Sequence, residues 1–96
     1  MGAVNATYYA MLYAARAALS EEDLYAKTHK GVWRLFSERF VASGRFERAL
    51  FAEAQRAQEL RLLGDYEARD VPSDEAKAIV EEAERFVAAV SEMLGA

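Results

Sequence analysis

The side chain with the clearest potential for chemistry is Arg61, near the end of a helix that the apolar spacing predicts over about 46–63. At about 100° per residue, Arg61 projects into the apolar arc of that helix. A guanidinium cannot lose its charge there, so it must pair with a carboxylate or face an anion. Glu53, Asp65 and Asp70 are candidates for a structural ion pair, and an anionic ligand is the functional alternative.

Arg16 raises the same question in the first helix, which is predicted from about Asn5 to Leu19 and carries no other charge. Burying a guanidinium without a partner is costly, so we expect a carboxylate from another helix or from a second chain. A ligand contact is the alternative, because charges in apolar surroundings are enriched at functional sites.

A short basic segment precedes the second predicted helix. Lys27, His29 and Lys30 flank Thr28, which is a suitable N-cap. Exposed backbone N–H groups at a helix start attract anions, so these three side chains could form a phosphate cradle. The alternative interpretation is a solvated loop that is basic by composition.

Several chemistries are excluded by composition. One histidine and no cysteine cannot build a structural zinc site, and no inward Glu/His pattern of a di-metal bundle is present. Glycine-rich phosphate loops and dinucleotide fingerprints are also absent from the sequence, so we expect neither metal nor cofactor. A net charge of −4 gives no general attraction to a polyanion, so any RNA contact needs a local basic patch.

The cellular compartment can also be predicted from the composition of the sequence. The sequence has no cysteine and no basic start with a cleavage site, which favours the cytoplasm. Its longest apolar stretch, residues 3–15, is shorter than the roughly 20 residues that span a bilayer, so we expect no membrane association.

Four helical segments are expected to position these side chains, over about 5–19, 28–43, 46–63 and 73–94. Gly44 and Gly64 are typical helix stops, and Ser73 after Pro72 is a typical helix start. No strand pattern competes with them. The chain is therefore predicted to be a single all-α domain over 1–96, an antiparallel up-and-down helical bundle.

The first of these helices is apolar almost all the way round, so it must be covered on several sides. A chain of 96 residues has a marginal core, and three further helices are too few to enclose this one completely. We therefore expect a homodimer that packs through the first helix, since closed two-fold dimers are the commonest assembly.

Three motifs together resemble the HEPN superfamily, in particular its small uncharacterised prokaryotic branch. They are Tyr8-Tyr9-Ala10-Met11-Leu12-Tyr13-Ala14-Ala15-Arg16-Ala17, then Lys27-Thr28-His29-Lys30-Gly31, then Arg61 ahead of Asp65-Tyr66. The resemblance implies a helical bundle, often dimeric, that works with a minimal nucleotidyltransferase in a toxin–antitoxin type system. Active members of the superfamily are metal-independent ribonucleases.

Two features depart from the family pattern. The ribonucleases carry a histidine a few residues after the arginine, but here Tyr66 stands in that place and no histidine follows. A phenol with a pKa of about 10 is a poor general base at neutral pH, so the resemblance favours binding over cleavage. The amphipathic helix that usually precedes the Tyr-Tyr-Ala-Met block is also missing from this sequence.

The sequence thus predicts a HEPN-like module that contacts a nucleotide or RNA. The resemblance assigns these contacts first to Arg61 and Tyr66, with Asp65 beside them, while Arg16, His29 and Lys30 are secondary candidates. The alternative is a dimerisation or structural helical subunit with no ligand, in which both arginines are paired internally.

Overall fold

The computed structural model describes residues 3–63 and 73–95, with side chains placed for 6–56, 59 and 77–95. Within these ranges the chain forms helices α1 (Ala3–Ser20), α2 (His29–Phe36), α3 (Arg48–Leu63) and α4 (Ser73–Met93). A short π-helix, η1 (Ser37–Val41), continues directly from α2. No strand occurs in the described part of the chain, so the predicted all-α architecture of four helices is confirmed.

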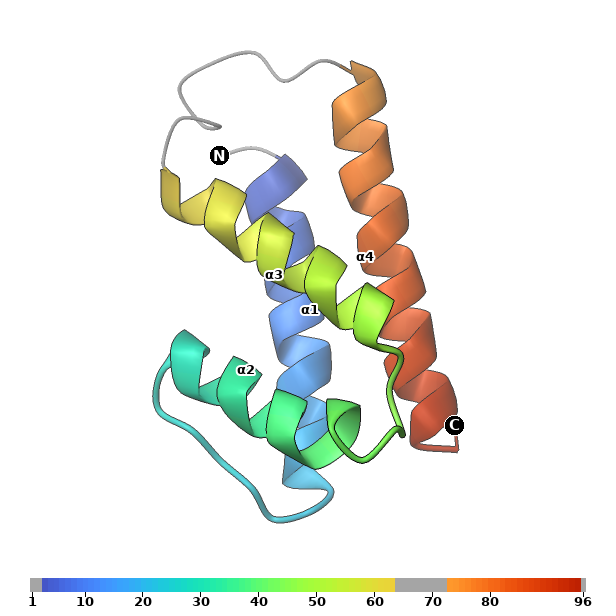
Figure 1. Cartoon of the computed structure of the whole chain (residues 1–96). Coiled ribbons are helices and arrows are strands. Elements are labelled where there is room, and N and C mark those ends of the chain that lie inside the picture. The colour runs from blue at the N-terminus through green and yellow to red at the C-terminus, as the bar shows by residue number, and fades with distance from the viewer. Residues whose placement is uncertain (1–2, 64–72, 96) are drawn as a thin grey trace.

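Helix α1 lies at the centre of the arrangement and contacts α2, α3 and α4. In Figure 1, α1 and α4 lie side by side and point the same way, while α3 crosses them obliquely in the opposite direction. Helix α2 crosses the C-terminal half of α1 below α3 (Figure 1). This arrangement leaves α2 and α3 as the two walls of one face of the molecule.

Buried aromatic side chains fill the space between the helices. They are Tyr8, Trp33, Phe36, Phe40, Phe46 and Phe86, each at most 3% exposed. Their rings meet mostly edge to face or tilted, with Phe36 5.0 Å from Phe46 and Trp33 5.8 Å from Phe86 between ring centroids. Burial of each such ring contributes about 1.5–3 kcal/mol, so the aromatic contacts account for much of the stability of this small core.

Most helix boundaries follow the predicted signals. The Thr28 hydroxyl accepts a hydrogen bond from the Gly31 N–H at 2.9 Å and so caps α2. Gly44 takes a φ of +84° after η1, which is the left-handed conformation expected of a glycine stop. Gly64 and Pro72 lie outside the described residues.

The π-helix is a difference from the predicted regular helix. In η1 the Ala42 N–H donates to the Ser37 carbonyl, five residues back, at 2.9 Å. The wider turn coincides with two consecutive buried side chains, Phe40 and Val41. Apolar periodicity does not distinguish such a turn from an α-helical one.

The prediction that α1 must be covered on several sides is confirmed, although one stripe of it stays uncovered. Its buried side chains are Tyr8, Met11, Leu12, Ala15, Ala18 and Leu19. Its exposed side chains include Ala6, Ala10, Tyr13 and Ala17, which recur at helical spacing on one face.

None of the helices in 3–63 and 73–95 is long and apolar enough to cross a membrane.

Candidate functional site

Arg16 is held by the loop that joins α1 to α2. Its Nη1 donates to the Ala26 carbonyl at 3.0 Å, and the side chain is half-buried. Arg16 forms no ion pair with any residue that the structure describes, so a carboxylate partner from elsewhere in the chain or from a second chain stays a prediction. The loop doubles back along α1 and so brings the carbonyl of Ala26, which precedes α2, to Arg16.

The three side chains of the basic segment lie in different surroundings. His29 is half-buried, with its ring 5.9 Å from that of Tyr8 and 5.7 Å from that of Tyr9. Lys27 and Lys30 are exposed, and Lys30 lines a groove between α2 and α3. The phosphate cradle therefore stays a prediction. Lys30 is also part of a second feature, the groove between α2 and α3.

This second feature, the α2–α3 groove, has a volume of about 650 Å³. Its lining residues are Lys30, Trp33, Arg34, Ser37 and Glu38 from α2 and η1, and Phe51, Gln55 and Glu59 from α3. Lys30 and Arg34 form no ion pair with any described residue. Two cations thus stand beside the groove without a described carboxylate partner.

The groove combines these cations with aromatic and amide groups. Trp33 lines the groove but is almost fully buried, and its Nε1 donates to the Tyr8 hydroxyl at 3.0 Å. Phe51 is half-buried beside it, 6.3 Å away between ring centroids. The Gln55 Nε2 atom is buried and has no hydrogen-bond partner among the described residues. An unsatisfied amide in a groove of this kind can donate to a bound group.

Arg34 and Gln55 were not singled out from the sequence. Both belong to rows with the four-residue spacing of a helix face, Lys30–Arg34 on α2 and Phe51–Gln55–Glu59 on α3. That spacing predicts the contents of each row. It cannot predict that the two rows face each other, which depends on how α2 and α3 pack.

The leading candidates from the sequence have side chains that lie outside the described residues. Arg61 belongs to α3, but its side chain, like Asp65 and Tyr66, lies outside the described residues. One predicted partner of Arg61 has another contact: Glu53 forms an ion pair with Arg85 of α4 at 3.6 Å.

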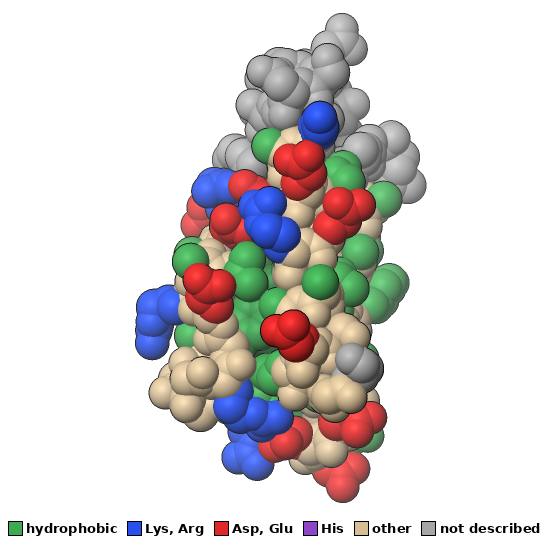
Figure 2. Space-filling view, turned by 90° about the vertical axis from the view of Figure 1, so that its right-hand side faces the viewer, with side chains coloured by type: hydrophobic (Ala, Val, Ile, Leu, Met, Phe, Trp, Pro, Cys, Tyr) green, Lys and Arg blue, Asp and Glu red, His purple; other side chains and the backbone are tan. Residues whose placement is uncertain are grey.

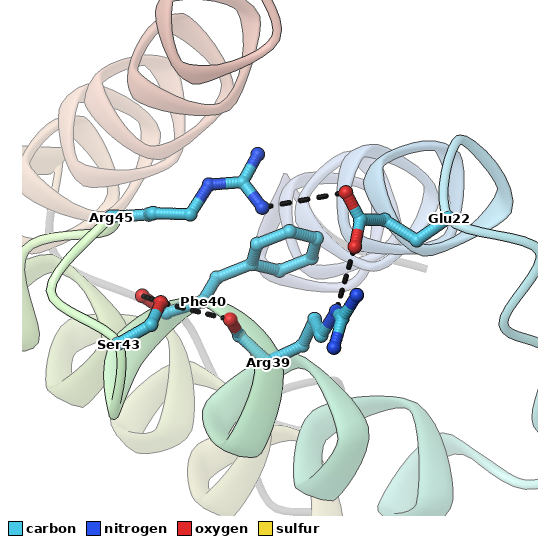
Figure 3. Close-up of polar contacts among 5 residues, drawn as sticks. All are labelled: Glu22, Arg39, Phe40, Ser43 and Arg45. Carbon is cyan, nitrogen blue, oxygen red and sulfur yellow. Dashed lines mark hydrogen bonds and ion pairs between the residues drawn. The ribbon is translucent and has the colours of Figure 1, made fainter.

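A separate polar cluster joins the end of α1 to the end of η1 (Figure 3). Glu22 accepts from Arg39 Nε at 2.6 Å and from Arg45 Nη1 at 3.4 Å. The Arg45 guanidinium lies 4.9 Å from the centre of the Phe40 ring. The Arg39 hydrogen bond, aided by Arg45, lowers the pKa of Glu22 below its usual value. The carboxylate uses both oxygens within the protein, which marks the cluster as structural.

The face formed by α3 and α4 has mixed charge. Figure 2 shows acidic and basic side chains interspersed over it, and the pairs Arg56–Glu82 and Arg85–Glu53 join the two helices there. In 3–63 and 73–95, no three histidine or acidic side chains gather so as to hold a metal ion. Among the described features, the α2–α3 groove is the one that combines two cationic side chains, aromatic rings and an unsatisfied amide in one place.

The structure is thus an all-α domain with a groove lined by aromatic side chains and by charged side chains of both signs. The chain matches the HEPN domain over residues 2–93, and it belongs to that family. A UPF0332 protein of Gloeobacter violaceus is 33% identical over 93 residues, which cover 95% of this chain and 74% of the relative. A protein of Methanocaldococcus jannaschii that is named as a putative toxin is 34% identical over 92 residues, which cover 96% of this chain and 69% of the relative. No solved structure matches the chain.

Proposed function

We propose that this HEPN-domain protein binds a nucleotide or RNA in the α2–α3 groove, as one component of a toxin–antitoxin type system with a nucleotidyltransferase partner. Membership of the HEPN family and the relatives named as putative toxins support the toxin–antitoxin part of this proposal. Cleavage is not part of the proposal, because Tyr66 stands where the family's ribonucleases carry a histidine.

One observation carries the proposal: Lys30 and Arg34, which have no described carboxylate partner, line the same groove as Trp33 and Phe51. The cations suit a phosphate group, and the half-buried ring of Phe51 offers apolar surface to a base. Gln55 Nε2 supplies a donor for a base or sugar acceptor. Glu38 and Glu59 oppose a dense negative charge, which favours a ligand that places few phosphates in the groove.

The other candidate residues take roles around this groove. Arg61 and Tyr66 are proposed to contact phosphate or base, with Asp65 beside them, since α3 leads from the groove toward this segment. Arg16 and His29, the secondary candidates from the sequence, are not among the residues that line the groove, and their contacts stay predictions. Arg61→Ala tests this part, because it is expected to weaken nucleotide binding as well as change the melting temperature.

Trp33 provides a direct assay, because it is the only tryptophan of the chain and lines the groove. Titration with AMP or a short oligouridylate at low salt is expected to quench its fluorescence, with affinity falling as salt rises. Lys30→Ala combined with Arg34→Ala is expected to weaken binding about tenfold or more. Lys77→Ala is the matched control, since Lys77 is exposed on α4. Absence of binding, or an equal loss in the control, would overturn the proposal.

The exposed stripe on α1 favours a second candidate function, a dimerisation or structural subunit with no ligand. This stripe is apolar or small at Ala6, Ala10, Tyr13 and Ala17. It borders a groove of about 530 Å³ between α1 and α4, among whose nine lining residues Glu84 is the only charged one. Under this alternative neither probe binds, and Arg61→Ala changes only the melting temperature. Self-association through α1 is compatible with both functions.

A further inference from the structure

A second pocket, the Arg16 pocket, shares no lining residue with the α2–α3 groove. It has a volume of about 370 Å³ and lies where the α1–α2 loop folds back on α1. Its lining residues are Tyr13, Arg16, Ala17, Leu19, Ser20, Leu24, Tyr25, Ala26 and Val32. Leu19 and Val32 are buried and Leu24 is half-buried, so much of the lining is aliphatic.

The pocket has an exposed aromatic rim. Tyr13 and Tyr25 are 63% and 73% exposed, which makes them the most exposed large hydrophobic side chains in the described part of the chain. Tyrosine and arginine together are typical of the residues that dominate protein–protein binding energy. The rim therefore has the composition of a binding surface.

Arg16 is the only charged residue among the nine that line the pocket. Its one hydrogen bond to a described residue uses Nη1 on the Ala26 carbonyl, which leaves further guanidinium N–H groups to bind an anion. It has no described carboxylate partner. An incoming carboxylate would supply the charge that Arg16 lacks.

We propose that the Arg16 pocket docks a peptide segment of a partner protein, in which an apolar side chain stands beside an aspartate or glutamate. The apolar side chain fills the aliphatic cavity between Tyr13 and Tyr25, and the carboxylate pairs with Arg16. Charge complementarity identifies this occupant, since the pocket offers one cation and no acidic side chain.

A nucleobase fits the same pocket less well. Besides Arg16, the only polar side chains at the pocket are the two tyrosines and Ser20, whose hydroxyl already donates to the Ala17 carbonyl at 2.8 Å. The polar edge of a base would lose hydrogen bonds to water without full replacement, whereas an aliphatic side chain loses none. The loop is also fixed in place by the Arg16 and Glu22 contacts, so little ordering is needed on binding.

Selection of a random peptide library on the purified full chain tests this proposal. Enriched peptides are expected to contain an apolar residue next to an acidic one. By fluorescence anisotropy, their affinity is expected to fall about tenfold or more with Arg16→Ala, with Tyr25→Ser, and when the peptide's acidic residue is changed to its amide. Lys77→Ala is expected to bind them like the wild type, because Lys77 lies outside the pocket.

Two results would overturn the proposal. One is a selection with no enrichment, or with peptides that bind the Tyr25→Ser protein as well as the wild type. The other is displacement of the peptides by a short oligouridylate whose own binding depends on Arg16, which would make the pocket a nucleic-acid site. Because Tyr25 is exposed, its variant keeps the test valid even if Arg16→Ala unfolds the loop. Loss of nucleotide binding at the α2–α3 groove would leave this result unchanged.

Discussion

At the scale of single residues, the hydrogen bond between Tyr8 and Trp33 is a polar contact inside the aromatic core. Both side chains are buried, and Trp33 Nε1 donates to the Tyr8 hydroxyl at 3.0 Å. Tyr8→Phe would leave the indole N–H without this acceptor, at a cost of about 1–3 kcal/mol. In a domain of this size each kcal/mol lowers the melting temperature by about 4–8 °C. Calorimetry should show this loss, while Tyr25→Phe, at an exposed position, should melt like the wild type.

The Glu22 cluster should give the protein a measurable acid sensitivity. Arg39, with Arg45, lowers the pKa of Glu22 in the folded state below the usual value of 4.5. A lowered folded-state pKa stabilises the protein above the unfolded-state pKa, and this stabilisation is lost as pH falls through the folded-state value. Urea unfolding from pH 6 down to about pH 3 should therefore show a smaller loss of stability in Glu22→Gln than in the wild type. Glu47→Gln, at an exposed position with no described ion pair, should behave like the wild type.

Residue types were easier to predict from the sequence than residue partners. The helical pattern identified Arg16 as a charge that needs a partner, but it could not predict the hydrogen bond to a backbone carbonyl ten residues away. Gln55 could not be identified as a groove residue, because an isolated glutamine on a polar helix face has no distinctive sequence signal. The partner of a side chain depends on how loops fold back and how helices cross. The pattern of residues along the sequence does not specify either of these.

At the scale of the elements, the start of α2 shows why a glycine can be required inside a helix. Replacing glycine by alanine in a helix usually stabilises it by about 1 kcal/mol. At Gly31 the new Cβ would lie 3.0 Å from Thr28 Oγ1 and 3.1 Å from Ala26 Cβ. Gly31→Ala should therefore disturb the Thr28 cap and reduce stability, since a cap contributes about 1 kcal/mol. Urea midpoints should show a smaller cost for Gly31→Ala when Thr28 is already alanine, and an equal cost would contradict this explanation.

The helices themselves could be predicted closely, because capping residues and apolar spacing act within a few residues of the chain. Thr28 and Gly44 occur at boundaries as expected, and α4 begins at Ser73. The π-turn of η1 could not be predicted, since its sequence differs little from that of an α-helical turn. The α2–α3 groove was missed for a different reason: its two rows come together only through tertiary packing.

At the scale of the whole molecule, the sequence predicted the central place of α1 from its composition. A helix with apolar residues on nearly all sides must contact several neighbours, and α1 contacts α2, α3 and α4. The described helices nevertheless leave Ala6, Ala10, Tyr13 and Ala17 of α1 exposed. In the predicted homodimer, the part of this stripe that a second copy would cover is Ala6 and Ala10, which line the groove between α1 and α4.

Ala10→Arg tests that prediction, because Ala10 lies on the exposed stripe and lines the groove between α1 and α4. If two copies pack through this face, light scattering should give a dimer for the wild type, and the variant should be monomeric because the new cation would be buried unpaired. The wild-type melting temperature should also rise with protein concentration. Ala49→Arg places the same change at an exposed position of α3 and should leave the dimer intact. A wild-type protein that is monomeric at every concentration and melts cooperatively would show that α1 needs no second copy.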